Sequence, residues 1–127
     1  MSNQKNVPKR VAGESPIFTK SYDFVAWLVP RTEHFPKCHR HSVTRRLIDA
    51  ALDFQEQLVE ANSVRGNERT QYLNQADASL DKVRFYLRLA HHWQWLNPGQ
   101  YEHVSEQVAE IGRLLGGWQW VTLQPRR

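Results

Sequence analysis

Apolar residues recur at spacings of three and four between residues 73 and 95, which predicts a long amphipathic helix around which the rest of the chain is organised. One apolar stripe consists of Leu73, Ala76, Leu80, Val83, Leu87 and Ala90. Arg84 and Arg88 lie one turn apart at the edge of this stripe. Further apolar residues point to other sides of the same helix: Phe85, Leu89 and Trp93. A helix that is apolar on several sides is either central in its fold or shared with another chain.

Two helices are predicted before this one. The first is expected to begin at Ser21 as N-cap and to end at Pro36, with a kink upstream of Pro30. The second is capped by Ser42, and its inward positions are Val43, Leu47, Ala50, Ala51, Phe54, Leu58 and Ala61. Its outer face is a row of acids: Asp49, Asp53, Glu56 and Glu60. Such a row is usually solvated, although cations of a partner helix could also cover it.

Turn residues separate the remaining elements. Gly66 is expected in the left-handed conformation between the second and third helices, and the third helix is expected to run to Leu96. Asn97 followed by Pro98 marks the start of a fourth helix. This helix buries Tyr101, Val104, Val108, Ile111 and Leu115. The pair of glycines at 116–117 is expected to stop it, leaving an apolar tail.

Four amphipathic helices joined by short loops, without a strand pattern, predict an all-α protein with an up-down-up-down antiparallel four-helix bundle. We expect a mobile basic arm over residues 1–20, although an incidental solvated tail is the simpler interpretation of that segment. The bundle would span residues 21–118 and a tail residues 119–127. One bundle of this size cannot easily bury so many large apolar groups beyond its core stripes, so a homo-oligomer is predicted. Its interface would use Phe85, Leu89, Trp93, Trp95 and Trp118.

Composition places the chain among single-domain globular proteins with a weak preference for anionic partners. It has 127 residues, a net charge of +4 and 40% apolar residues. The lone Cys38 excludes an internal disulfide and indicates a reducing compartment. A polar N-terminus and the lack of a long apolar run indicate a cytoplasmic protein without a membrane span.

Positive charge gathers in two segments. Between residues 31 and 46 a single acid, Glu33, faces five cations: Arg31, Lys37, Arg40, Arg45 and Arg46. Lys82 joins Arg84 and Arg88 on the third helix, where no acid intervenes. In an antiparallel bundle both segments would share one end, where Tyr86, Trp93 and Trp95 could stack on bases while the cations contact phosphates. Alternatively, Arg84 and Arg88 pair with Asp77, Asp81 or the acids of a neighbouring subunit.

Other chemistry finds little support in the sequence. A di-iron bundle needs Glu-x-x-His pairs, and none occurs. His34, Cys38, His39 and His41 include zinc-ligand types, but their spacing does not match structural zinc sites. A nucleophilic Cys38 would need to be held beside a base with an orienting acid, and a loop next to Pro36 offers no evidence for that; there is also no glycine-rich phosphate loop. We therefore expect no catalytic residue, no metal and no cofactor.

Several short motifs together carry a resemblance to a known family. They are WLVP at 27–30, FP at 35–36, RFYLR at 84–88 and EIGRLLGGW at 110–118. In this order and spacing, from residue 22 to residue 118, the chain resembles the bundle family that contains the accessory variability determinant (Avd) of diversity-generating retroelements. The same family includes four-helix proteins encoded in intervening sequences of bacterial 23S ribosomal RNA genes.

The resemblance implies a homopentameric barrel that binds the retroelement's reverse transcriptase and nucleic acid, RNA and possibly DNA, during mutagenic copying of a template RNA. Catalysis would belong to the reverse transcriptase. Arg84 and Arg88 match the motif arginines of the third helix, and Arg45 and Arg46 match a basic start of the second. Arg113 lies in the terminal motif, where a structural role and an RNA-binding role are both open. The alternative function is a self-associating structural bundle of the intervening-sequence type.

Overall fold

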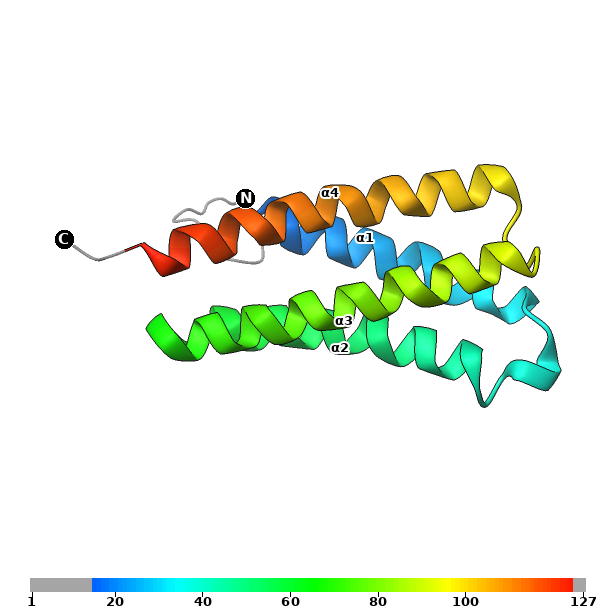
Figure 1. Ribbon diagram of the computed structural model, residues 1–127, viewed down its shortest axis with the longest axis horizontal. Coiled ribbons are helices and arrows are strands. Elements are labelled where there is room, and N and C mark those ends of the chain that lie inside the picture. Colours follow the sequence, from blue (N-terminus) through cyan, green and yellow to red (C-terminus); the bar gives the residue numbers. More distant parts are fainter. Residues whose placement is uncertain (1–14, 125–127) are drawn as a thin grey trace, which may run out of the picture.

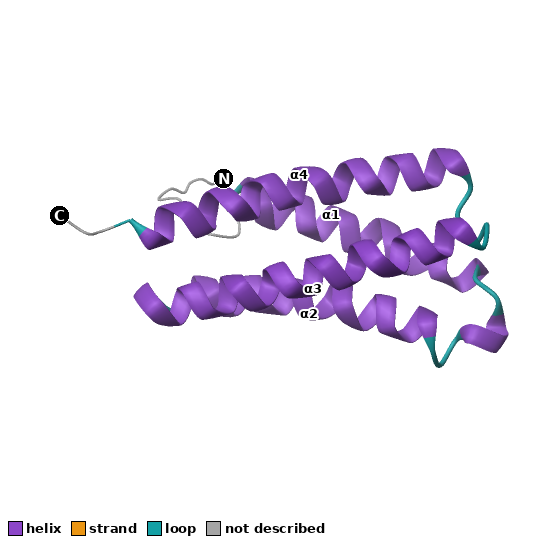
Figure 2. Cartoon of the chain, in the orientation of Figure 1, coloured by secondary structure: helices purple, strands orange, loops and turns teal. Residues whose placement is uncertain are grey.

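The protein is an antiparallel four-helix bundle in the computed structural model, which describes residues 15–124 (Figure 1). Its elements are α1 (Pro16–Arg31), η2 (Thr32–His34), η3 (Lys37–His39), α2 (Val43–Asn62), α3 (Gly66–His92) and α4 (Pro98–Leu123). Helices account for nearly all of the described chain, and no strand occurs within it (Figure 2). The all-α fold and the alternating helix directions predicted from the periodicity are confirmed.

The core consists of the stripes that the periodicity predicts. All six positions of the α3 stripe are buried, and so are the main inward positions of α2 and α4. From α1 and its connection, Phe24, Leu28 and Phe35 close the core. Burying a Leu or Phe side chain stabilises a fold by about 1.5–3 kcal/mol, so these stripes hold the four helices together.

The helices pack in a ring, and the most extensive packing is between α2 and α3. Both helices carry buried alanines, Ala50 and Ala61 on α2 and Ala76 on α3, and small buried residues let helix backbones approach closely. Ser79, also buried, forms a hydrogen bond of 2.8 Å with the side-chain amide of Gln57 across this contact. The packing of α1 against α2 is much sparser, so α1 is held mainly by α4.

Several predicted helix ends are wrong. The first helix begins at Pro16 rather than at Ser21, and Ser21 is buried in its interior with its hydroxyl donating to the Phe18 carbonyl. It ends at Arg31, and the short turn η2 separates it from Pro36. The third helix ends at His92, before the predicted Leu96. Residues 16–20 are therefore helical, while residues 1–14 of the predicted arm lie outside the described part.

The two glycines at 116–117 do not stop α4, which continues to Leu123. The predicted tail over 119–127 is consequently helical up to that residue, and residues 125–127 lie outside the described part. A helix tolerates each glycine at a cost of about 1 kcal/mol, which packing beyond it can offset. Trp118 provides such packing through an edge-on contact with Phe18, with ring centroids 5.9 Å apart.

Two turn predictions are confirmed. Gly66 has φ of +61°, the left-handed region that glycine enters without steric cost. The side chain of Asn97 accepts a 2.7 Å hydrogen bond from the Gln100 amide, and the Gln100 side chain accepts one from the Asn97 amide. This capping box, with Pro98 in the first turn, fixes where α4 begins. Ser42 is the N-cap residue of α2, but its hydroxyl donates to the His39 carbonyl instead of capping the helix.

Candidate nucleic-acid interface

One end of the bundle carries both the α1–α2 connection and the α3–α4 connection (Figure 1). The first connection contains η2 and η3, and the second contains residues 93–97. The start of α2 therefore lies beside the end of α3, as the antiparallel arrangement predicts. We call this region the connector end. It is where the two cationic segments of the sequence were expected to meet.

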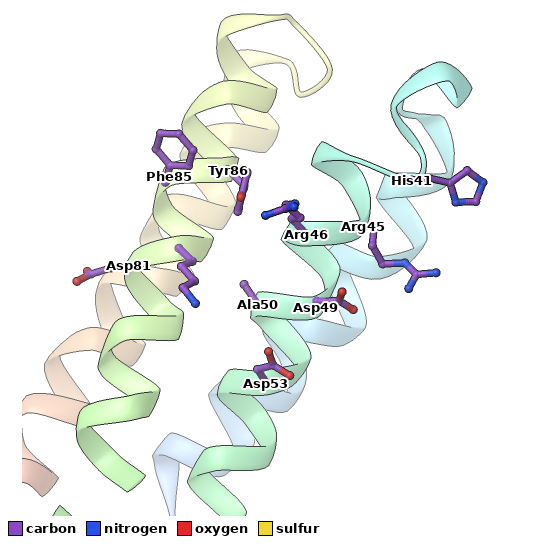
Figure 3. A pocket seen from close by; sticks show the side chains of 10 residues that line it. His41, Arg45, Arg46, Asp49, Ala50, Asp53, Asp81, Phe85 and Tyr86 are labelled. Atoms are coloured by element: carbon purple, nitrogen blue, oxygen red, sulfur yellow. The ribbon is translucent and has the colours of Figure 1, made fainter. Parts of the chain in front are cut away.

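A groove of about 630 Å³ separates α2 from α3 near the connector end (Figure 3). Its cations are Arg45, Arg46 and Lys82, with His41 at the rim. Arg46 points from α2 toward Tyr86 on α3, whereas Arg45 and His41 point to the other side of α2. Three carboxylates also line the groove: Asp49, Asp53 and Asp81. Asp81 points away from α2, so Asp49 and Asp53 are the acids left to balance the cations of the groove. The positive charge of the groove is therefore concentrated toward the connector end, beside Arg46.

A second hollow of about 340 Å³ lies under the α1–α2 connection and carries a net excess of positive charge. Lys37, Arg40 and Arg45 line it against the single acid Glu33. Thr44 also lines the hollow, and its hydroxyl oxygen is buried without a hydrogen-bond partner among the described residues. Three exposed cations around a buried hydroxyl suit the oxygen atoms of a phosphate group. We call this the phosphate hollow.

Arg84 does not join these cations. It leaves α3 on the opposite flank, where its guanidinium pairs with Asp81 at 2.7 Å and lies against Gly112 of α4. This contact agrees with the alternative considered from the sequence, in which Arg84 pairs with Asp81 of its own helix instead of a ligand. The pair is largely exposed, and exposed ion pairs contribute only about 0–1 kcal/mol. Arg88 is exposed and has no carboxylate within ion-pair distance among residues 15–124.

The other two predicted arginines are held by their own helices. Arg31 lies over the Trp27 ring, 4.4 Å from its centroid, and donates to the Trp27 carbonyl. Arg113 forms an ion pair with Glu110 one turn earlier on α4. The structure thus brings Lys37, Arg40 and Arg45 to the phosphate hollow and Arg46 to the neighbouring groove, whereas the remaining four predicted cations line neither.

The five predicted interface residues fall into two groups. Phe85 and Trp93 are 54% and 45% exposed, and Leu89 is half-buried. Trp95 and Trp118 are also half-buried, but they pack against the core of their own chain. The subunit interface remains a prediction, and Phe85 is its most accessible residue on a helix face.

Arg69 is a structural cation that the sequence analysis did not single out. Its Nε donates a 2.9 Å hydrogen bond to the Ala61 carbonyl at the end of α2, and its guanidinium faces the Trp118 ring of α4. Burial, and then the charge of Arg65, lower the pKa of Arg69 from its ordinary value. This side chain joins three helices at the end opposite the connectors, so it belongs to the fold rather than to a binding surface.

A metal site is not supported by the geometry. Among residues 15–124, no three His, Cys, Asp or Glu side chains are close enough together to hold an ion. Cys38 is exposed, and His39 directs its ring toward Trp93 and Trp95 rather than toward other ligand types. The sequence analysis named Trp93 and Trp95, but it did not predict that His39 packs against them. None of the described helices is long and apolar enough to cross a membrane.

Comparison with known proteins agrees with the bundle and identifies a family. A crystal structure of a protein of unknown function from the S23 ribosomal protein family of Bacteroides thetaiotaomicron is similar, with a TM-score of 0.74 at 17% identity. The match covers 81% of this chain and 97% of that one, and at this identity it shows the fold alone. No curated protein matches the sequence. The model of the bAvd-like family matches residues 16–121, nearly all of the described helices. The chain therefore belongs to the bAvd-like family.

Proposed function

We propose that the protein is a non-catalytic accessory of a diversity-generating retroelement. It binds the reverse transcriptase and nucleic acid, template RNA and its cDNA, and so supports mutagenic reverse transcription in the cytoplasm. It acts as a homo-oligomer, with five subunits as the number that the family resemblance implies. The observation that carries this proposal is the match to the bAvd-like family over residues 16–121.

The connector end supplies the surface for nucleic acid in this proposal. The phosphate hollow presents Lys37, Arg40 and Arg45 on one short stretch of chain, with Arg46 in the neighbouring groove. Each cation neutralises one phosphate and releases condensed counterions, which makes binding depend on salt concentration. Contacts of this kind fix the position of a strand but do not read its sequence. The reverse transcriptase, or base pairing within the bound RNA, would supply the sequence specificity.

The experiment compares two double variants with equal loss of charge. Arg40→Ala with Arg45→Ala removes two cations of the phosphate hollow, whereas Lys20→Ala with Arg65→Ala removes two exposed cations at the opposite end. We expect the first variant to bind single-stranded RNA about tenfold more weakly, with a salt slope smaller by about 1.4. The matched variant should bind like wild type. Fluorescence anisotropy over a salt series measures both quantities.

Co-purification with the reverse transcriptase of the same retroelement tests the second half of the proposal. Tagged wild-type protein should retain the polymerase and RNA together. Equal weakening of RNA binding in both double variants would show that only net charge matters and would remove the phosphate hollow from the site. A wild-type protein that retains neither RNA nor polymerase would contradict the proposed function itself.

A self-associating structural bundle is the second candidate function. The acidic row on α2 favours it, because these carboxylates are exposed and could face cations of another subunit. The fold is also shared with the S23-family structure, whose function is unknown. A stable oligomer that binds no RNA and no polymerase at low salt would favour this function over the first.

A further inference from the structure

We propose that Trp93 and His39 form a stacking platform for unpaired nucleobases at the connector end, so that the protein prefers single-stranded nucleic acid. This inference rests on the proposed function, since it adds a contact for the base to a surface that binds the phosphate. The class of ligand is an unpaired RNA or DNA strand, because bases inside a duplex are already stacked on each other and their faces are not accessible.

The platform is a compact cluster of four rings from both connections. His39 is nearly parallel to Trp93, with an angle of 8° and a centroid distance of 6.2 Å. Trp95 lies 5.2 Å from Trp93 and 5.3 Å from His39. Phe35, which belongs to the core, supports Trp95 from behind at 5.2 Å. Through Phe35, the cluster is therefore anchored in the core on one side.

The turn that carries the two tryptophans is defined by its backbone. The amide of Trp95 donates 2.8 Å to the Ala90 carbonyl, and the amide of Gln94 donates to the His91 carbonyl. Gln94 has φ of +65°, a left-handed conformation that is unfavourable for a residue with a side chain. Positions of this kind persist when surrounding contacts fix them, and they concentrate at binding sites. The turn holds Trp93 outward, where it is 45% exposed, while Trp95 packs inward.

The positive charges next to the rings indicate that the ligand is a nucleic-acid strand. His39 is the last residue of η3, which begins at Lys37, and Arg40 follows directly. The same turn thus presents a ring to the aromatic cluster and cations to the phosphate hollow. A strand whose phosphate occupies that hollow therefore needs to cross only this turn to bring a base to the rings. Aromatic rings beside a cationic track are the arrangement that binds single strands without a strict sequence preference.

Trp93→Leu provides the test, because leucine retains an apolar side chain but offers no aromatic face. Trp120→Leu is the matched control, since Trp120 is 65% exposed and lies in the last turn of α4, far along the helix from the connector end at which α4 begins. The probes are a single-stranded RNA of about 12 nucleotides, an abasic strand with the same number of phosphates, and the corresponding duplex. Anisotropy gives the affinity, and light scattering gives the oligomer mass of each variant.

We expect Trp93→Leu to weaken binding of the single-stranded RNA about 5- to 150-fold, since one stacked base contributes about 1–3 kcal/mol and about 1.4 kcal/mol is tenfold. The salt slope should stay the same because no phosphate contact is lost. Affinity for the abasic strand should be equal in wild type and Trp93→Leu. Trp93→Phe should restore most of the binding, and Trp120→Leu should behave like wild type.

Three outcomes would overturn the platform. A similar affinity of wild type for the abasic and the normal strand would mean that no base is stacked, even though phosphate binding and the proposed function stand. An equal loss of affinity for both strands in Trp93→Leu, or a lower oligomer mass of that variant, would assign Trp93 to the protein's own structure or to a subunit contact. Absence of binding by wild type to every probe would overturn both the platform and the nucleic-acid part of the proposed function.

Discussion

At the scale of single residues, the glycine at position 112 of α4 leaves room for the side chain of Arg84 on α3. A Cβ atom at position 112 would lie 2.5 Å from Nη2 of Arg84, so the missing side chain leaves the space that the guanidinium fills. Arg84 belongs to the RFYLR motif of α3, and Gly112 belongs to the EIGRLLGGW motif of α4. Two motifs that are far apart in the sequence are thus halves of one contact between α3 and α4. The contact places the Arg84 side chain on the face of the bundle away from the phosphate hollow.

Gly112→Ala should move Arg84 without unfolding the protein. The alanine favours the helix by up to about 1 kcal/mol, and the exposed Arg84–Asp81 pair that it disturbs contributes less than about 1 kcal/mol. We therefore expect the free energy of unfolding in urea to change by less than about 1 kcal/mol, while the Arg84 Nε–H resonance shifts. Ala substitution at the exposed Gly116, where a Cβ would meet nothing, is the control. A loss above about 2 kcal/mol would show that Arg84 cannot leave this space.

At the scale of elements, the periodicity predicts the four helices correctly, but only some of their first and last residues. Asn97 and Gly66 act locally, through a cap and a positive φ, and both were recognisable in the sequence. Ser21 resembled a cap, but Ser15 precedes Pro16 at a better start, and Ile17 and Phe24 bury the additional turn. The glycines at 116–117 resembled a stop, yet contacts of Trp118 with residues 18 and 69 extend the helix past them. Ends that depend on tertiary packing are not visible in a local pattern.

The start of α4 gives a quantitative test at this scale. Asn97→Ala removes the cap that accepts from Gln100 and leaves that amide without its partner. We expect a loss of about 1 kcal/mol in the free energy of unfolding, within the 0.5–2 kcal/mol observed for such caps. Asn67→Ala, at an exposed position in the first turn of α3, should cost less. Equal stability of Asn97→Ala and wild type in urea denaturation would contradict the capping role.

At the scale of the whole molecule, the sequence predicted that two cationic segments meet at one end, but not which side chains face each other. Arg45, Arg46 and Lys82 do line one groove, whereas Arg84 faces α4. A rotation of about 100° per residue puts positions 82 and 84 about 200° apart, so this separation could have been read from the helical wheel. The phosphate hollow could not, because it depends on how η2 and η3 fold over the start of α2.

Self-association is the prediction that belongs to the whole molecule. Light scattering should give a mass several times the 15.0 kDa of one chain, and about five times if the family resemblance extends to subunit number. Phe85→Asp should lower this mass, since it places a charge on an exposed apolar residue of α3. Tyr22→Asp is the control on α1, where the side chain is 70% exposed. A 15.0 kDa species for wild type at micromolar concentration would end the prediction.

Helix α1 begins, and helix α4 ends, at the end of the bundle opposite the connector end (Figure 1). Labels attached there are therefore far from the connector end. The 27-residue helix α3 spans about 40 Å at 1.5 Å per residue, and it runs between the two ends of the bundle. A dye or biotin attached at Ser15 or Gln124 would therefore sit about 40 Å from the tryptophan turn. A molecule immobilised in this way exposes its connector end to solution, and a fluorophore on the 5′ or 3′ end of a strand would report its orientation by energy transfer.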